Sequence, residues 1–161
     1  MKSIRRDLHK IPELGFKEYN TKEYIKNFIN NRACEVFEFE ETGICVFFDF
    51  KNEKTICLRA ELDALPIQEK KVSDYSSLYE GRMHACGHDG HMAILLSLID
   101  DILEKRIEVC HNVLFLFQPS EEIYVNFDSG NGAFFICTGK KCFQPRDLIL
   151  GGGEHIFGAL R

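Results

Sequence analysis

Residues 112–117 constrain the fold of this chain more than any other segment. Asn112 is followed by five consecutive apolar side chains, and polar residues bound the run at both ends. Successive side chains of a strand point to opposite faces, so a strand that is apolar at every position is buried on both faces. Such a strand lies inside a sheet against which other layers pack, and the chain is therefore expected to form a layered fold.

The segments before this run alternate between helical and extended patterns. Apolar residues at helical spacing predict helices over residues 1–10, from about residue 20, and over residues 90–105. Apolar or alternating runs predict strands over residues 34–40, 43–50 and 55–60. This order predicts an α/β fold with αβα layers and a mixed, largely parallel sheet.

Two local signals add detail to this prediction. Asn20 is expected to cap the second helix, with Glu23 reaching back as in a capping box. The polar residues 51–54 are expected to form a turn that makes strands 43–50 and 55–60 neighbours in the sheet.

Residues 83–91 hold three imidazoles, a thiol and a carboxyl group within nine positions. This density of ligand groups indicates a transition-metal site, and Gly87 lets Cys86 and His88 turn toward one ion. The helix that follows is expected to favour the thiolate form of Cys86 through its positive N-terminal end. The alternative is that these are ordinary polar residues of a loop.

Carboxylates follow two of the predicted strands, where ligands collect in α/β folds. Of the adjacent Glu121 and Glu122, one can bind a metal while the other transfers a proton; alternatively they are a solvated acidic pair. Asp63 can accept a hydrogen bond that orients a ligand imidazole, or can serve only as a turn residue. The remaining histidines that we expect to be surface or packing residues are His9, His111 and His155.

The composition argues against several classes of partner. The formal net charge is -5 and basic residues form no long run, so nucleic acid and anionic membranes are not expected as partners. No apolar run approaches the roughly 18 residues that span a bilayer, and no secretory signal is visible. The seven cysteines lack paired spacing, which predicts a reducing, cytoplasmic location without disulfides.

Five segments together resemble the M20 metallopeptidase family, in particular its amidohydrolase branch of hippurate hydrolases, N-acetyl-diaminopimelate deacetylases and auxin-conjugate hydrolases. The matching segments are residues 5–9, 12–16, 58–67, 81–91 and 117–122. Their order and spacing over residues 3–124 make the resemblance specific, although no single motif would.

The resemblance implies a pair of divalent metal ions, manganese or zinc, with nickel or cobalt also acceptable. It implies that Cys86, His88 and Glu122 are metal ligands, that Glu121 is the general base and that Asp63 supports the site. The implied reaction is hydrolysis of the amide bond of an N-acyl amino acid or small peptide, in which Glu121 takes a proton from water and returns it to the leaving amine.

The chain also departs from the family pattern. Glu61 stands where the family usually has an aspartate. Residues 1–124 are expected to form the N-terminal part of the catalytic domain and residues 125–161 a divergent tail, so that the domain is incomplete and weakly active or inactive. The alternatives are a non-catalytic remnant that binds metal or a partner, and a fragment without a ligand whose open sheet edges favour a homo-oligomer.

Overall fold

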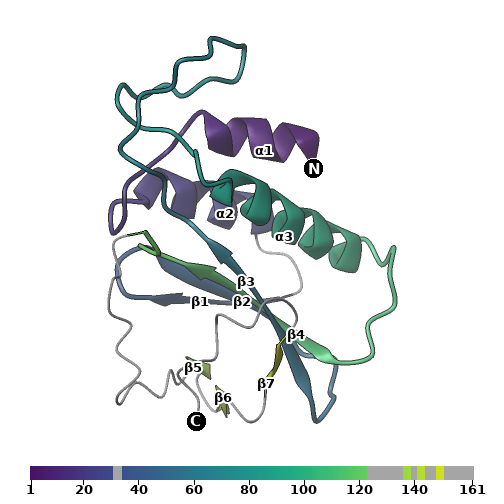
Figure 1. Cartoon of the computed structure of the whole chain (residues 1–161). Helices are drawn as coiled ribbons and strands as arrows, with labels where there is room; N and C mark the ends of the chain where they lie inside the picture. The colour runs from purple at the N-terminus through teal and green to yellow at the C-terminus, as the bar shows by residue number, and fades with distance from the viewer. Residues whose placement is uncertain (31–33, 123–135, 139–140, 144–147, 151–161) are drawn as a thin grey trace.

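The computed structural model describes residues 1–30 and 34–122, and also the backbone of three short strands between residues 136 and 150. The helices are α1 (Lys2–His9), α2 (Tyr19–Ile29) and α3 (His88–Leu103). The strands are β1 (Glu35–Phe39), β2 (Gly43–Phe48), β3 (Thr55–Glu61), β4 (Asn112–Gln118), β5 (Ile136–Thr138), β6 (Lys141–Phe143) and β7 (Leu148–Leu150). Every helix and strand predicted above is therefore present, with ends shifted by a few residues (Figure 1).

The larger sheet has the strand order β1-β2-β4-β3-β7. The central strand is β4, the run that the sequence singles out, and it is antiparallel to β2 and parallel to β3. Strand β1 is antiparallel to β2, and β7 is parallel to β3. The mixed α/β sheet is thus confirmed, with its parallel pairing confined to β4, β3 and β7; strands β5 and β6 form a separate antiparallel pair.

The prediction that residues 51–54 join neighbouring strands is wrong, because β4 lies between β2 and β3. The side chain of Asn112 holds this connection at the start of β4. Its Oδ1 accepts the N–H groups of Phe50 at 2.8 Å and Asn52 at 3.2 Å, and its Nδ2 donates to the carbonyl of Asn52 at 2.8 Å. A central strand forms hydrogen bonds with a neighbouring strand on each of its two edges. Because β4 lies between β2 and β3, both of its edges are paired in this way.

The start of α2 also differs from the prediction. Glu18 is the N-cap residue, and neither it nor Asn20 caps the helix with its side chain. Instead the buried carboxylate of Glu13 accepts the backbone N–H groups of Asn20 at 3.2 Å and Thr21 at 2.8 Å. A carboxylate at this end satisfies free N–H groups and interacts well with the helix dipole, so Glu13 replaces the predicted cap.

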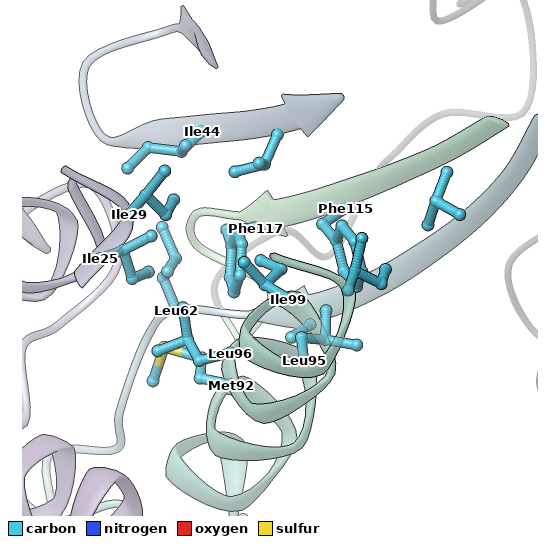
Figure 2. Close-up of a cluster of buried hydrophobic side chains, with 14 of the residues drawn as sticks. Ile25, Ile29, Ile44, Leu62, Met92, Leu95, Leu96, Ile99, Phe115 and Phe117 are labelled. Carbon is cyan, nitrogen blue, oxygen red and sulfur yellow. The ribbon is translucent and has the colours of Figure 1, made fainter. Parts of the chain in front are cut away.

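The main core lies between the three helices and one face of the sheet. Figure 2 shows Phe115 and Phe117 of β4 pointing toward Ile99 of α3, while Ile44 of β2 lies next to Ile29 of α2. All five side chains are fully buried. Truncating a side chain of this kind to alanine typically costs about 2–5 kcal/mol, so this face fixes how α3 sits on the sheet.

The opposite face of the sheet is apolar as well, as expected for a central strand buried on both sides. Its buried cluster is formed by Cys45, Phe47, Cys57 and Leu114. The three described helices all belong to the first face. Of the predicted αβα arrangement, the described residues therefore show the sheet and one helical layer.

Helix α3, at 16 residues, is the longest described helix. Within the described residues, no helix combines the length and apolar character needed to cross a membrane. Among the described residues, Cys45, Cys57, Cys86 and Cys110 are free thiols.

Candidate metal centre

Parallel pairing brings the ends of β3 and β4 together. Glu61, the last residue of β3, pairs with Gln118, the last residue of β4. The next N–H, that of Leu62, donates to the carbonyl of Gln118 at 2.8 Å. The segments that follow the two strands therefore start side by side, at the strand ends where α/β folds place their ligands.

Gly87 makes the turn into α3. Its φ of 98° lies in the left-handed region, which glycine adopts without the penalty that a side chain brings. Its carbonyl accepts the N–H of Gly90 at 2.8 Å, so the helix begins at His88, earlier than the predicted start near residue 90. Cys86 thus precedes the helix while His88 opens it.

The side chains predicted as ligands meet in space. A sulfur of Cys86, a ring nitrogen of His88 and a carboxylate oxygen of Glu122 all lie within 4.8 Å of one another. Nε2 of His88 is 3.9 Å from Oε1 of Glu122 and 4.0 Å from Oε2 of Glu121. The side chain of Glu121 is 40% exposed, so a carboxylate that water can reach stands beside the three candidate ligand atoms.

Asp63 orients both sides of this group. Nδ1 of His88 donates to the main-chain carbonyl of Asp63 at 2.8 Å, which leaves Nε2 facing Glu122. The carboxylate Oδ2 of Asp63 accepts the backbone N–H of Glu122, also at 2.8 Å. Fixing one ring nitrogen through a carbonyl is a common way of presenting the other to a metal.

Charge in the site shifts the ionisation of these groups. Burial alone would raise the pKa of Asp63, but His88 and the N–H groups of Glu122 and Glu121 lower it below its usual range. Burial alone would lower the pKa of His88, but the hydrogen bonds to Asp63 raise it to about 9. Without an ion, the site therefore favours positive charge on its imidazole.

The predicted thiolate form of Cys86 is wrong for the ion-free chain. Desolvation, and then the nearby carboxylates of Glu122 and Glu121, raise the pKa of the Cys86 thiol to about 11. Desolvation and these negative charges together outweigh the partial positive charge at the start of α3. The thiol therefore needs a cation beside it to ionise near neutral pH.

The residues fit a divalent cation. Oε1 of Glu122 is buried and accepts no hydrogen bond, and the buried Oδ1 of Asp63 has only Nδ1 of His88 nearby, at 3.5 Å. Buried acceptors of this kind are normally satisfied by a donor, water or an ion. A thiol, an imidazole and a carboxylate together form a donor set that suits zinc and related divalent ions.

The segment that carries Glu121 and Glu122 is held in a strained conformation. Ser120, which is fully buried, has a φ of 54°, in the left-handed region that non-glycine residues seldom adopt. Its N–H donates to Oε1 of Glu18 at 2.8 Å, and Oε2 of Glu18 accepts the Thr42 hydroxyl at 2.7 Å. No local pattern indicates this role of Glu18, because its partners Thr42 and Ser120 lie far along the chain.

A second cluster of ligand types also contains His88. Candidate ligand atoms of Glu61, His88 and His91 lie within 4.8 Å of one another. Nδ1 of His91 donates to Oε2 of Glu61 at 2.8 Å, and Arg59 donates to Oε1. Because Nδ1 of His88 is already bonded to Asp63, only Nε2 is free for an ion, and the two clusters cannot both use it at once.

His9 is more than the packing residue that the sequence suggests. It is buried, and its Nδ1 lies 2.8 Å from Oδ2 of Asp89, next to His88. Arg5 reaches the same oxygen at 3.2 Å. The spacing of Arg5 and His9, four apart on one helix face, is the one sequence signal that could have revealed this pair. His111 is half-buried, and His155 lies outside the described residues.

Two curated relatives are similar to most of this chain. The N-acetyldiaminopimelate deacetylase of Oceanobacillus iheyensis is 46% identical over 125 residues, which are 76% of this chain and 33% of that protein. The N-acetyldiaminopimelate deacetylase of Bacillus velezensis is 46% identical over 123 residues, which are 74% of this chain and 32% of that protein. The chain thus spans about a third of the length of these relatives.

A solved structure and a family match agree with these relatives. The YXEP protein of Bacillus subtilis, described as a dinuclear metal-binding peptidase of the M20 family, is similar with a TM-score of 0.71 and 36% identity, over 77% of this chain and 36% of that chain. The model of peptidase family M20/M25/M40 matches residues 57–154, a range that includes all the candidate ligands. Because the match continues past residue 124, the domain boundary expected there stays a prediction. The chain therefore belongs to the peptidase family M20/M25/M40.

Proposed function

We propose that this chain carries the metal-binding part of an amidohydrolase that cleaves the amide bond of N-acyl amino acids or small peptides. The observation that carries the proposal is the meeting of Cys86, His88 and Glu122 around buried acceptors, with Glu121 beside them. The curated relatives named above are deacetylases of an N-acetylated amino acid, which supports an acylated amino acid as the substrate.

In this proposal, Cys86 Sγ, His88 Nε2 and Glu122 Oε1 hold the cation. When bound, a pair of divalent ions, manganese or zinc and alternatively nickel or cobalt, polarises the scissile carbonyl and lowers the pKa of water. Asp63 keeps the His88 ring and the Glu122 backbone in place through its two hydrogen bonds. The relative described as dinuclear supports the number of ions.

Glu121 is the general base of the proposed reaction. Its Oε2 is 4.0 Å from His88 Nε2, so it borders the ion site, and its exposure lets water and substrate approach. The carboxylate would take a proton from the attacking water and return it to the leaving amine. The assignment of Glu122 as ligand and Glu121 as base is supported by exposure rather than distance, because the Glu122 side chain is 24% exposed and grouped with Cys86 and His88, whereas that of Glu121 is 40% exposed.

A second candidate function is ion binding without hydrolysis. It is favoured by the donor set itself, since Cys86, His88 and Glu122 can hold an ion without any proton transfer by Glu121. A remnant of this kind would keep the three ligand side chains and bind a metal or a partner. Metal content and turnover together distinguish the two candidates.

The test measures both quantities on the purified chain. Metal analysis after dialysis against Mn²⁺ or Zn²⁺ gives the number of bound ions, and an assay on N-acetyldiaminopimelate and other N-acyl amino acids gives turnover. We expect ion binding that Cys86→Ser reduces, with weak turnover that Glu121→Gln abolishes. Ion binding without turnover would favour the second candidate, and absence of both would refute the proposal.

A further inference from the structure

A buried pair of side chains joins α1 to the start of α3. Nδ1 of His9, the last residue of α1, donates to Oδ2 of Asp89 in the first turn of α3 at 2.8 Å. Nε of Arg5 lies 3.2 Å from the same oxygen. Asp89 is fully buried and the His9 side chain is 9% exposed. Hydrogen bonds to a charged group that is shielded from water are strong and directional.

The other ring nitrogen of His9 faces a different segment. Nε2 of His9 is 3.4 Å from Oε1 of Glu69, and Oε2 of Glu69 accepts the N–H of Ser77 at 2.7 Å. The carbonyl of Lys10 accepts the N–H of Leu78 at 2.9 Å. His9 therefore contacts α3 through Nδ1 and the loop of residues 66–80 through Nε2, and these contacts can be changed separately.

Asp89 directly follows His88, so the anchor and the candidate ligand share one helical turn. In the structure, the His88 ring is bonded to the Asp63 carbonyl at 2.8 Å. A shift of the helical turn would move the His88 backbone relative to that carbonyl. Either that bond would lengthen or Nε2 would move away from Glu122. Metal sites need their ligands held within about 0.5 Å of the working geometry, so such a shift would weaken ion binding.

We propose that His9 and Asp89 are positioning residues: their buried bond fixes the first turn of α3 and thereby presents His88 to the ion. This inference rests on the proposed function, because it concerns the same ion site. It assigns a role to the N-terminal helix, whose residues lie far from the candidate ligands in sequence and belong to neither cluster of candidate ligands.

Two amide variants separate the two contacts of His9. In His9→Asn, the amide nitrogen is attached to Cγ, as Nδ1 is, and can still donate to Asp89. In His9→Gln, the amide lies one atom further out, as Nε2 does, and reaches toward Glu69 instead. His111→Gln, just before β4, is the matched histidine-to-glutamine control because it belongs to neither contact.

The first measurement is Co²⁺ binding to the full chain. Binding is monitored by the sulfur-to-cobalt absorption band, which Cys86→Ser should remove. We expect His9→Gln to weaken binding by about 10-fold or more, the range seen when groups that orient ligands are removed. His9→Asn and His111→Gln should keep wild-type affinity at an equal folded fraction by circular dichroism. Equal affinity for His9→Gln and the wild type would overturn this inference and leave the proposed function standing.

The second measurement needs no metal. In the ion-free His9→Gln variant, hydrogen exchange should be faster than in the wild type, and the increase should be larger at the amides of residues 90–94 than at those of β4. In the His9→Asn variant, exchange at both places should stay as slow as in the wild type. Uniform acceleration in both places would mean that His9 adds only global stability, and would overturn the positioning role. If the wild type binds no Co²⁺, the proposed function fails and the presentation of His88 to an ion fails with it, while the exchange pattern still shows whether His9 holds the first turn of α3.

Discussion

The two clusters that share His88 contain similar ligand types but differ in their hydrogen bonds. The first consists of Cys86, His88 and Glu122, and the second of Glu61, His88 and His91. In the first, Oε1 of Glu122 is buried and accepts no hydrogen bond. In the second, both oxygens of Glu61 are occupied, one by His91 and the other by Arg59.

This difference shows that closeness of ligand types does not by itself define a metal site. An ion at Glu61 would have to replace existing hydrogen bonds and would sit near the positive guanidinium of Arg59, which repels it. An ion at Glu122 would instead satisfy an acceptor that is otherwise buried without a partner. We therefore expect His88 Nε2 to serve the first cluster.

The largest expected effect is that of Glu122→Gln on ion affinity. Removing one charged partner from a buried pair costs about 3–5 kcal/mol, which corresponds to a loss of about 10³-fold in affinity. Glu61→Gln is the matched control in the second cluster, and its affinity should stay close to that of the wild type. Competition with a chromogenic Zn²⁺ chelator measures both variants.

The reverse result would break the comparison. If Glu61→Gln lost affinity while Glu122→Gln kept it, the ion would bind in the second cluster and displace Arg59. Equal large losses in both variants would mean that one ion draws ligands from both clusters, against the argument that Nε2 of His88 serves only the first.

Glu121→Gln should separate proton transfer from ion binding. Turnover of N-acyl amino acids should fall by about 10²-fold or more, because general-base catalysis typically contributes at least that factor. Ion affinity should change little, since the amide keeps the size of the side chain and Glu121 is not a proposed ligand. Parallel loss of ion affinity in the chelator assay would instead make Glu121 a ligand.

Local patterns predicted the elements of the fold, but not how the strands are ordered. The apolar run after Asn112 correctly predicted a central strand, because burial on both faces leaves a mark at every position. The insertion of β4 between β2 and β3 was missed, because it depends on pairing between segments far apart in sequence. The cap on α2 was missed for a different reason: Glu13 precedes the helix by several residues, so it does not stand at the position where a capping box places its carboxylate.

The candidate site divides in the same way. The spacing of Cys86 and His88 around Gly87 is local, and it predicted a turn that the structure has. The thiolate form expected for Cys86 does not hold for the ion-free chain, because desolvation and carboxylates from another segment of the chain raise the pKa of its thiol. His9 and Glu18 could not be assigned, because their roles depend on partners across the fold.

Asp63→Asn should have a smaller effect than loss of a ligand. The asparagine can still accept the N–H of Glu122, but its uncharged side chain supports the His88 ring less well. We expect ion affinity to fall by about 10–100-fold, as is typical when a residue that orients a ligand is altered. Isothermal titration with Zn²⁺ would measure this, and an unchanged affinity would show that the Asp63 carbonyl alone orients His88.

The smallest expected effect comes from Glu18→Gln, which removes charge behind the first cluster without removing a contact. The amide can still accept the Ser120 N–H and donate to Thr42, so ion affinity should persist. Burial raises the pKa of Glu18 despite these hydrogen bonds, so its contribution favours folding at low pH and is lost as pH rises through the folded-state value. Relative to the wild type, the variant should therefore gain stability between about pH 4 and pH 7, by about 1 kcal/mol or less. Urea unfolding at both pH values measures the gain, and a difference that does not change with pH would contradict it.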